Sequence, residues 1–318
     1  MRSNFLSRVH RGIKRRIMRL LNKPVPLYFS IAADITNDCN IRCPFCFSTF
    51  GAPRVNMTPD HFVKALSLTP LVAEGMFLIS CAFEPTIHPE FNSMLDLISP
   101  HLGSRAILST NLLAPDPDTI HRLAELPIHH LNVSVDSLEA QSYESLRRGG
   151  RFERFEENLH RLCDCRKISS RPVPMFGISV VTRRNRPFLK DMGYRLADLG
   201  FVLHEVRDLF LDSATPARWK SDSILTDEDW DGLMEELSDA SPILQITPPL
   251  RLFERYAGHP RLNPYQLKYI QTGVGLRIEP EGRVLVQGTD RVYHLSDIDD
   301  PLAFFTREYP SLARIVAP

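Results

Sequence analysis

The feature that most constrains this chain is a regular alternation of strand-like and helix-like segments over its first two thirds. Six apolar, β-rich runs occupy residues 27–36, 76–81, 105–112, 130–136, 176–182 and 204–210. Segments with helical spacing of apolar residues lie between them, at 59–68, 88–98, 116–126, 143–146, 152–166 and 187–199. Such alternation is typical of parallel strands joined by right-handed crossovers. Six units are too few for the eight of a closed TIM barrel, so the sequence predicts an α/β fold with a partial (β/α)6 barrel.

Three parts are expected along the chain: a basic amphipathic N-terminal helix (1–26), the partial barrel (27–211) and a small α+β C-terminal extension (212–318). Within the extension, Thr226 and the three acidic residues after it favour a helix start, because hydroxyls and carboxylates suit the positive end of a helix. Residues 275–278 and 283–287 flank a Glu-Pro-Glu-Gly turn and predict a β-hairpin.

Charge is zero overall but unevenly distributed, since residues 1–33 hold eight Lys or Arg and no acid. Residues 1–23 could therefore contact an anionic membrane or an acidic partner, or form a helix across the bottom of the barrel with its basic face in water. No apolar run is long enough to span a bilayer, and the N-terminus lacks a secretory signal pattern. Three of the six cysteines cluster within eight residues, which indicates metal binding in a reducing compartment. We expect a cytoplasmic protein with no nucleic-acid partner.

The clustered cysteines are Cys39, Cys43 and Cys46, in a C-x3-C-x2-C arrangement just after the first strand-like run. Three thiolates supply one ligand fewer than a closed tetrahedral zinc site or a fully ligated iron–sulfur cluster requires. One metal position is thus open for another ligand. Structural zinc with a distant fourth ligand is the alternative, but no second cysteine pair or suitably spaced histidine pair follows.

Polar or otherwise unusual residues lie at the ends of the other predicted strands, where functional groups of parallel α/β folds gather. They are Glu84 after the second run, Thr110 and Asn111 in the third, Ser134 and Asp136 in the fourth, Val181 and Thr182 in the fifth, and Glu205 and Arg207 in the sixth. One rim of the barrel is therefore expected to collect cysteines, carboxylates, hydroxyls and a guanidinium.

These motifs resemble the radical S-adenosylmethionine (radical SAM) superfamily over about 175 residues. Residues 39–46, Cys-Asn-Ile-Arg-Cys-Pro-Phe-Cys, resemble its cysteine signature, including the aromatic Phe45 before the last cysteine. Residues 81–89 resemble its Gly-Gly-Glu-Pro stretch with a following His-Pro pair, and 109–111 resemble Thr-Asn-Gly. Residues 131–137 and 143–152 resemble the family's fourth-strand region.

The resemblance implies a single [4Fe–4S] cluster on the three cysteines, with SAM chelated to the fourth iron. Reduction of the cluster, by an external donor such as flavodoxin or ferredoxin, would cleave SAM to a 5′-deoxyadenosyl radical that abstracts hydrogen from a small polar organic substrate. The implied SAM contacts are Glu84 with the amino group, Arg147 with the carboxylate, Thr110, Asn111, Ser134 and Asp136 with the sugar and methionine edges, and Phe45 and Val181 beside the adenine.

The chain departs from the family pattern at three places. Ala82 and Phe83 replace the paired glycines, and Leu112 follows Asn111 in place of glycine. Residues 276–287 resemble the hairpin that ends in a cluster-binding cysteine in SPASM and twitch extensions, but Gln287 stands at that position and no cysteine follows Cys165. We therefore expect one cluster, and a redox-neutral reaction such as isomerisation, epimerisation, elimination or radical addition.

Several alternatives stay open. Cys81 could donate a hydrogen atom to a substrate radical or be a small core residue. Glu205 and Arg207 could contact substrate or form an ion pair on the barrel rim. Ser134 and Asp136 could serve the site or cap the next helix, and either Arg147 or Arg148 could point inward. For the whole protein, the alternatives are a radical SAM enzyme that modifies a ribosomally made peptide and a non-catalytic cluster- or zinc-binding scaffold.

Overall fold

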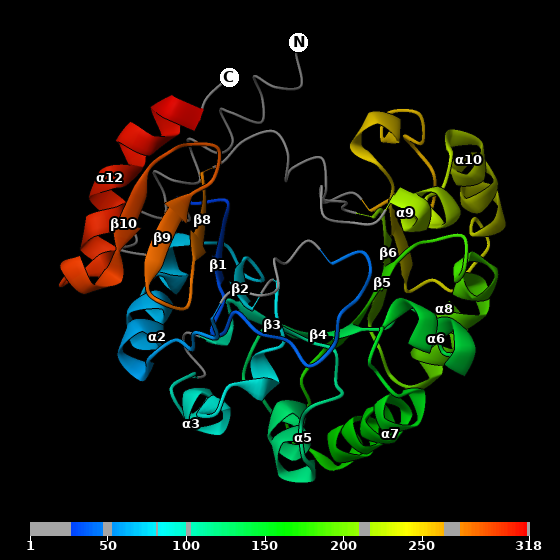
Figure 1. Ribbon diagram of the computed structural model, residues 1–318, viewed down its shortest axis with the longest axis horizontal. Coiled ribbons are helices and arrows are strands. Elements are labelled where there is room, and N and C mark those ends of the chain that lie inside the picture. Colours follow the sequence, from blue (N-terminus) through cyan, green and yellow to red (C-terminus); the bar gives the residue numbers. More distant parts are fainter. Residues whose placement is uncertain are drawn as a thin grey trace.

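The computed structural model describes residues 27–46, 53–80, 82–99, 103–209, 217–263 and 274–316. The predicted N-terminal helix and Cys81 lie outside these ranges. Seven parallel strands follow one another in chain order and form most of one curved sheet (Figure 1). They are β1 (Ser30–Ala33), β2 (Phe77–Ile79), β3 (Ala106–Thr110), β4 (His130–Ser134), β5 (Met175–Val180), β6 (Leu203–Arg207) and β7 (Leu244–Thr247).

The six predicted strands are confirmed as β1 to β6, each shorter than its apolar run. β7 is a seventh parallel strand, paired with β6, and it comes from the segment that the sequence assigned to the extension. The partial barrel is therefore one strand wider than predicted. Its short apolar run, residues 244–247, carries too little periodicity to be told from a loop by sequence alone.

Helices cover the outer face of the curved sheet, as Figure 1 shows. They are α2 (Pro59–Leu66), α3 (Phe91–Asp96), α5 (Pro117–Ala124), α6 (Ala140–Leu146), α7 (Phe152–Ile168) and α8 (Leu189–Asp198). α2 and α5 both begin with proline, and the caps Thr58 and Asp116 accept hydrogen bonds from backbone N–H groups of the first turn. α3 starts later than its predicted start at residue 88, because His88 precedes a proline and is extended.

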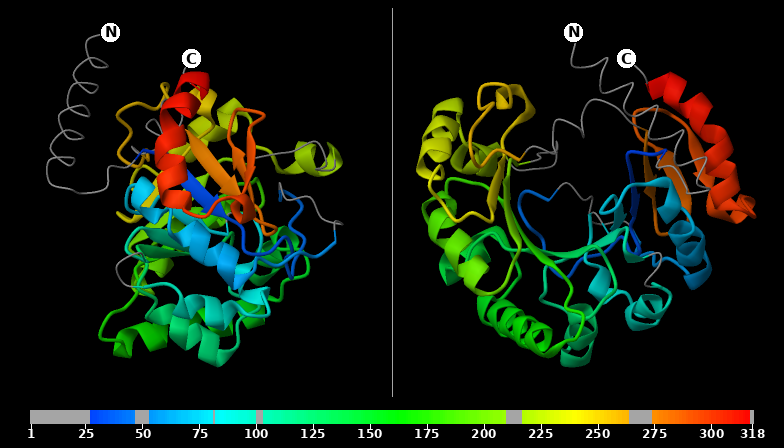
Figure 2. Two further views of the ribbon diagram at one scale, coloured as in Figure 1. Left: turned by 90° about the vertical axis from the view of Figure 1, so that its left-hand side faces the viewer. Right: turned by 180° about the vertical axis from the view of Figure 1, so that it is seen from behind.

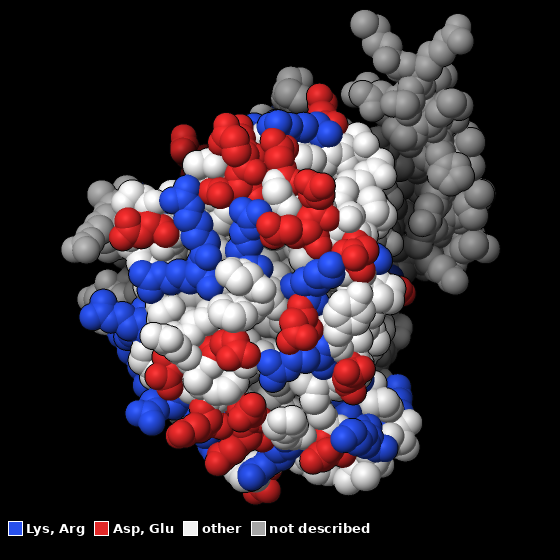
Figure 3. Space-filling view, turned by 90° about the vertical axis from the view of Figure 1, so that its right-hand side faces the viewer, with Lys and Arg blue, Asp and Glu red and all other residues white. Residues whose placement is uncertain are grey.

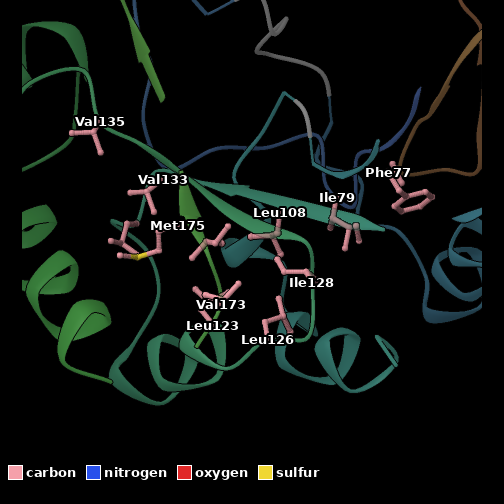
Figure 4. Close-up of a cluster of buried hydrophobic side chains, with 14 of the residues drawn as sticks. Phe77, Ile79, Leu108, Leu123, Leu126, Ile128, Val133, Val135, Val173 and Met175 are labelled. Carbon is pink, nitrogen blue, oxygen red and sulfur yellow. The ribbon is translucent and has the colours of Figure 1, made fainter. Parts of the chain in front are cut away.

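The core of the barrel wall lies between the sheet and these helices. Figure 4 shows side chains from β2 to β5 and from the α5 region filling this layer. The labelled residues are Phe77, Ile79, Leu108, Leu123, Leu126, Ile128, Val133, Val135, Val173 and Met175. All are less than one tenth exposed. Alternate strand residues point the other way, into the barrel, among them Asn132 and Ser134 of β4 and Glu205 and Arg207 of β6.

The rest of the C-terminal segment extends the sheet at its opposite edge. β8 (Gly275–Ile278) pairs parallel with β1, and the predicted hairpin is confirmed as β8 and β9 (Arg283–Val286), followed by β10 (Val292–His294). α12 (Pro301–Val316) covers this edge, where the hydroxyl of Tyr28 donates to the carbonyl of Phe305 at 2.8 Å. Within the described residues all ten strands belong to one sheet. The division into three domains stays a prediction.

Two further helices precede β7. They are α9 (Ala217–Ser223) and α10 (Asp227–Glu236), which begins at Thr226 as predicted, with a reciprocal capping box between Thr226 and Asp229. Figure 3 shows that acidic and basic side chains intermix on the face that includes this part of the molecule. Ion pairs such as Arg186–Glu236 and Arg251–Asp227 lie here. No helix within the described ranges combines the length and hydrophobicity needed to cross a bilayer.

Candidate cofactor site

The cysteine loop follows β1 at the carboxyl-end rim of the barrel. Cys39, Cys43 and Cys46 are half-buried and unpaired with one another. The Cys46 N–H donates to the Cys43 carbonyl at 3.1 Å, which turns the loop back on itself, and the Arg42 N–H donates to the Arg148 carbonyl at 2.8 Å. The loop is thereby fixed to the end of α6, on the far side of β4.

Arg147 is the residue that points inward, whereas Arg148 is exposed. Its Nε lies 2.5 Å from Asp136 Oδ2, and its Nη1 donates to Cys43 Sγ at 3.8 Å. Burial disfavours the charged guanidinium, but the adjacent carboxylate of Asp136 raises the pKa of Arg147 above its ordinary value. Arg147 is therefore a permanent cation whose charge is shared between a buried carboxylate and a cysteine sulfur.

Asp136 does not cap the helix after β4. Its Oδ1 accepts from the Val180 N–H at 2.8 Å, which ties the end of β4 to the end of β5. Ser134, two residues earlier, is half-buried on the barrel side of the same strand. Asn185 reinforces this junction, because its Nδ2 donates to the carbonyls of Asp136 and Val180 at 2.7 and 2.9 Å. The rim at β4 and β5 is thus held rigidly in place.

Asn111 contacts the cysteine loop from the end of β3. Its Nδ2 lies 2.7 Å from Asn40 Oδ1 and 3.8 Å from Cys39 Sγ, while its Oδ1 accepts from the Leu113 N–H. Leu112, which stands where the family motif has glycine, adopts a φ of +61°. The turn after Asn111 therefore keeps the left-handed backbone that glycine favours, and leucine adopts it at a cost in strain.

Glu84 is buried, and both of its carboxylate oxygens accept hydrogen bonds from the chain. Its Oε1 accepts from the Thr86 and Thr110 hydroxyls at 2.6 and 2.7 Å, and its Oε2 accepts from the Asn111 N–H at 2.6 Å. Burial raises the pKa of the Glu84 carboxyl above its ordinary value, and these hydrogen bonds act in the opposite direction. Glu84 and Thr110 thus lock the turn after β2 to the end of β3. Oε2 has one such donor and keeps acceptor capacity for a ligand.

Phe45 and Val181 are both buried, as wall residues would be. The Arg147 guanidinium lies 5.8 Å from the centre of the Phe45 ring, in cation–π range. Phe45 also contacts Trp219 of α9, with ring centres 5.9 Å apart. Sequence reasoning missed Trp219, because no motif or period connects it to the cysteine loop 170 residues earlier.

Glu205 and Arg207 form an ion pair, one of the two arrangements expected for them from the sequence. Arg207 Nη2 lies 3.1 Å from Glu205 Oε2. The Thr247 hydroxyl donates to Glu205 Oε1 at 2.9 Å, and Asn263 Nδ2 lies 3.5 Å from the same oxygen. The pair therefore belongs to a polar network across β6 and β7, on the barrel side of both strands. A role in substrate binding stays a proposal.

A second network that the sequence did not indicate joins the C-terminal hairpin to the rim. Asp34, at the end of β1, is buried, and Arg277 of β8 approaches its Oδ2 with Nε at 2.9 Å and Nη2 at 2.8 Å. The other oxygen of Asp34 accepts from the Ala82 N–H at 3.2 Å. The hairpin thereby supports the turn that carries Glu84.

The donor set fits an iron–sulfur cluster. Within the described ranges no group of three or more His, Cys, Asp or Glu converges on a single metal-ion position. Three cysteine thiolates are the type of ligand that holds such clusters, each thiolate on a different iron. Burial raises the pKa of Cys39 to about 12 and that of Cys43 to about 11, so cluster binding would have to displace both protons. N–H donors from Asn111 and Arg147 already reach two of the three sulfurs.

Sequence comparison matches residues 34–184 to the family model of the radical SAM superfamily. GTP 3′,8-cyclase of Chlorobaculum tepidum is 29% identical over 132 residues, 40% of this chain and 39% of that protein. AdoMet-dependent heme synthase of Methanosarcina barkeri is 26% identical over 127 residues, 39% of this chain and 36% of that protein. This chain thus matches well under half the length of either relative.

Solved structures show the same fold over nearly the whole chain. Streptococcus suis SuiB bound to S-adenosylmethionine superposes with a TM-score of 0.64, at 13% identity, over 92% of this chain and 69% of that one. Native anSMEcpe with bound AdoMet gives a TM-score of 0.60, at 15% identity, over 90% and 83%. Residues 34–184, which carry the cysteine loop and the rim contacts, thus belong to the radical SAM superfamily, whose members use a [4Fe–4S] cluster and SAM; the solved structures show the same fold.

Proposed function

We propose that this chain is a radical SAM enzyme with one [4Fe–4S] cluster, acting on a small polar organic substrate. The observation that carries the proposal is a set of side chains from the ends of β3, β4 and α6 that meet beside the cysteine loop. Asn111 reaches Cys39, Arg147 reaches Cys43, and Asp136 holds Arg147. A scaffold that merely bound a cluster would not need a buried charged pair beside one sulfur and an enclosed carboxylate nearby.

The residues that would hold the two groups follow from their positions. Cys39, Cys43 and Cys46 would bind three irons, and the methionine end of SAM would bind the fourth. When both are bound, they supply one-electron cleavage of SAM to a 5′-deoxyadenosyl radical that can take hydrogen from a substrate carbon. Glu84 Oε2 retains capacity to accept from the SAM amino group, and Arg147 is the cation placed for its carboxylate.

The part played by this chain is to orient the groups and to exclude water. Asp136, Asn185 and the end of β5 form one hydrogen-bonded unit, so the wall beside the site is rigid. Glu84 fixes the turns after β2 and β3 in the same way. Arg147 and Asn111 donate to cysteine sulfurs, and such donors raise the reduction potential of a bound cluster.

For the substrate, the polar network of Glu205, Arg207, Thr247 and Asn263 offers donors and acceptors on the barrel side of β6 and β7. We propose that this network contacts the substrate. Gln287, in place of the extension's cysteine, is exposed at the end of β9, and no cysteine follows Cys165 in the sequence. A single cluster favours redox-neutral chemistry, as proposed from the sequence.

A peptide substrate is the second candidate. It is favoured by solved structures of the same fold that hold peptides. These are SuiB bound to precursor peptide SuiA, with a TM-score of 0.63 at 14% identity, and anSMEcpe with bound AdoMet and the Cp18Cys peptide. Those likenesses concern the fold alone. Deuterated small metabolites and deuterated synthetic peptides can be offered to the enzyme in parallel. The substrate class whose deuterium appears in 5′-deoxyadenosine is the one from which hydrogen is abstracted.

Anaerobic reconstitution tests the proposal directly. We expect about four iron atoms per chain and release of 5′-deoxyadenosine from SAM on reduction with dithionite. Cys43→Ala should abolish this release, whereas the matched control Cys165→Ala, on α7, should leave it intact. Binding of one zinc and no iron, or equal release from both variants, would show the assignment to be wrong.

A further inference from the structure

Trp219 places a C-terminal aromatic residue against the cysteine loop. It lies in α9, whose position beside the loop is visible in the left view of Figure 2. Its ring centre is 5.9 Å from that of Phe45, with the ring planes inclined by 38°. A flat base between two rings would need roughly 7 Å, two van der Waals separations. The two rings are therefore in contact and form one continuous apolar wall.

α9 is also tied to the loop after β5. The Arg183 N–H donates to the Ser223 carbonyl at 3.0 Å, and Arg183 Nη1 donates to the Ser221 carbonyl at 3.3 Å. Ser223 is fully buried. This loop begins at Val181, the residue proposed beside the adenine of SAM. α9 thus bridges the two segments, one with Phe45 and one with Val181, that would flank that base.

The indole N–H of Trp219 is buried and has no hydrogen-bond partner among the described residues. An indole nitrogen can only donate, and a buried donor without an acceptor costs about 1–3 kcal/mol. Adenine offers ring nitrogens N1, N3 and N7 as acceptors. A ligand base against this wall would therefore supply both the stacking surface and the missing acceptor.

We propose that Trp219 is a cofactor-binding residue that packs against the adenine of SAM and donates its indole N–H to a ring nitrogen. The inference rests on the proposed function, since it requires SAM in the site. It assigns to the C-terminal segment, beyond the family-matched residues 34–184, a direct part in holding the cofactor.

The test measures SAM binding to the reconstituted protein rather than turnover. Equilibrium dialysis with Trp219→Phe, which keeps a ring but loses the N–H, should show affinity about five-fold weaker. Trp219→Leu, which loses the ring too, should bind roughly ten-fold more weakly or worse. Tyr194→Leu removes an aromatic residue from the outside of α8 and is the matched control, with unchanged affinity.

Tryptophan emission gives a second readout, because the chain has two tryptophans and the other, Trp230, is buried in α10. SAM should change the emission of the wild type and of Tyr194→Leu, but not of Trp219→Phe. Methionine alone should bind the variants and the wild type equally. The EPR signal of the reduced cluster measures this binding.

Three outcomes would overturn the inference. One is that the Trp219 variants show the same SAM affinity and the same change in tryptophan emission as the wild type. Another is equal weakening of methionine and SAM, which would place the effect at the cluster and not at the base. Failure of the wild type to bind iron would overturn the proposed function and the inference with it, so the iron count distinguishes the two.

Discussion

Replacing Arg147 by Met should destabilise the fold by roughly 3–5 kcal/mol, because it leaves a buried carboxylate without its counter-charge. Asp136 is fully buried, and its Oδ2 lies 2.5 Å from Arg147 Nε. Methionine keeps the apolar stem of the side chain and removes the guanidinium. Stabilities of 5–15 kcal/mol are typical of folded domains, so the loss would be a large share of the total.

The matched partner variants separate charge from packing. Arg148→Met changes the exposed neighbour and should cost no more than about 0.5 kcal/mol. Asp136→Asn combined with Arg147→Met removes both charges while keeping an acceptor for the Val180 N–H. The double variant should therefore recover most of the stability that Arg147→Met loses, a coupling of at least about 2 kcal/mol.

Guanidinium chloride unfolding at pH 7, followed by far-ultraviolet circular dichroism on the iron-free protein, would measure these differences. The expected order of midpoints is wild type and Arg148→Met, then the double variant, then Arg147→Met. The reasoning would be refuted if Arg147→Met and Arg148→Met had the same unfolding midpoint. It would also be refuted if the double variant were no more stable than Arg147→Met. Either result would mean that Asp136 is well solvated or otherwise neutralised.

Two further predictions concern the buried residues His204 and Leu112. Burial lowers the pKa of His204 to about 3, so the unfolded chain binds its proton first as the pH falls below about 6.5, and stability should drop by about 2 kcal/mol between pH 7.5 and 5. Urea unfolding midpoints across that pH range would show this drop. In His204→Leu, the part of the pH dependence of stability that His204 causes should be absent. At Leu112, with φ at +61°, glycine should be better tolerated than alanine by about 1 kcal/mol, the reverse of the order in a helix. Equal thermal midpoints for the two variants would contradict strain at this position.

Strand and helix positions were predictable because they depend on local periodicity. The apolar run of β3 and the helical spacing of apolar residues in α5 can each be read within ten residues. Caps such as Thr58 and Thr226 are equally local. The late start of α3 was also encoded in the sequence, by the proline after His88, but it requires weighing one residue against a periodic pattern.

The candidate site divides in the same way. The cysteine spacing and the polar residues at strand ends were evident from the sequence, because parallel strands bring their carboxyl ends to one rim. Which arginine points inward was not evident, because Arg147 and Arg148 end the same helix, and the choice depends on where Asp136 and Cys43 lie in space.

By itself, the sequence determined the parallel barrel and the three-thiolate loop, since each depends on residue type and short spacing. Tertiary structure alone decided that residues beyond 211 complete both edges of the sheet, that Arg277 supports Asp34 across 243 positions, and that Trp219 meets Phe45. The reason is physical. Contacts between distant segments are selected by the packing of the whole chain, and neither periodicity nor motif records which surfaces will meet.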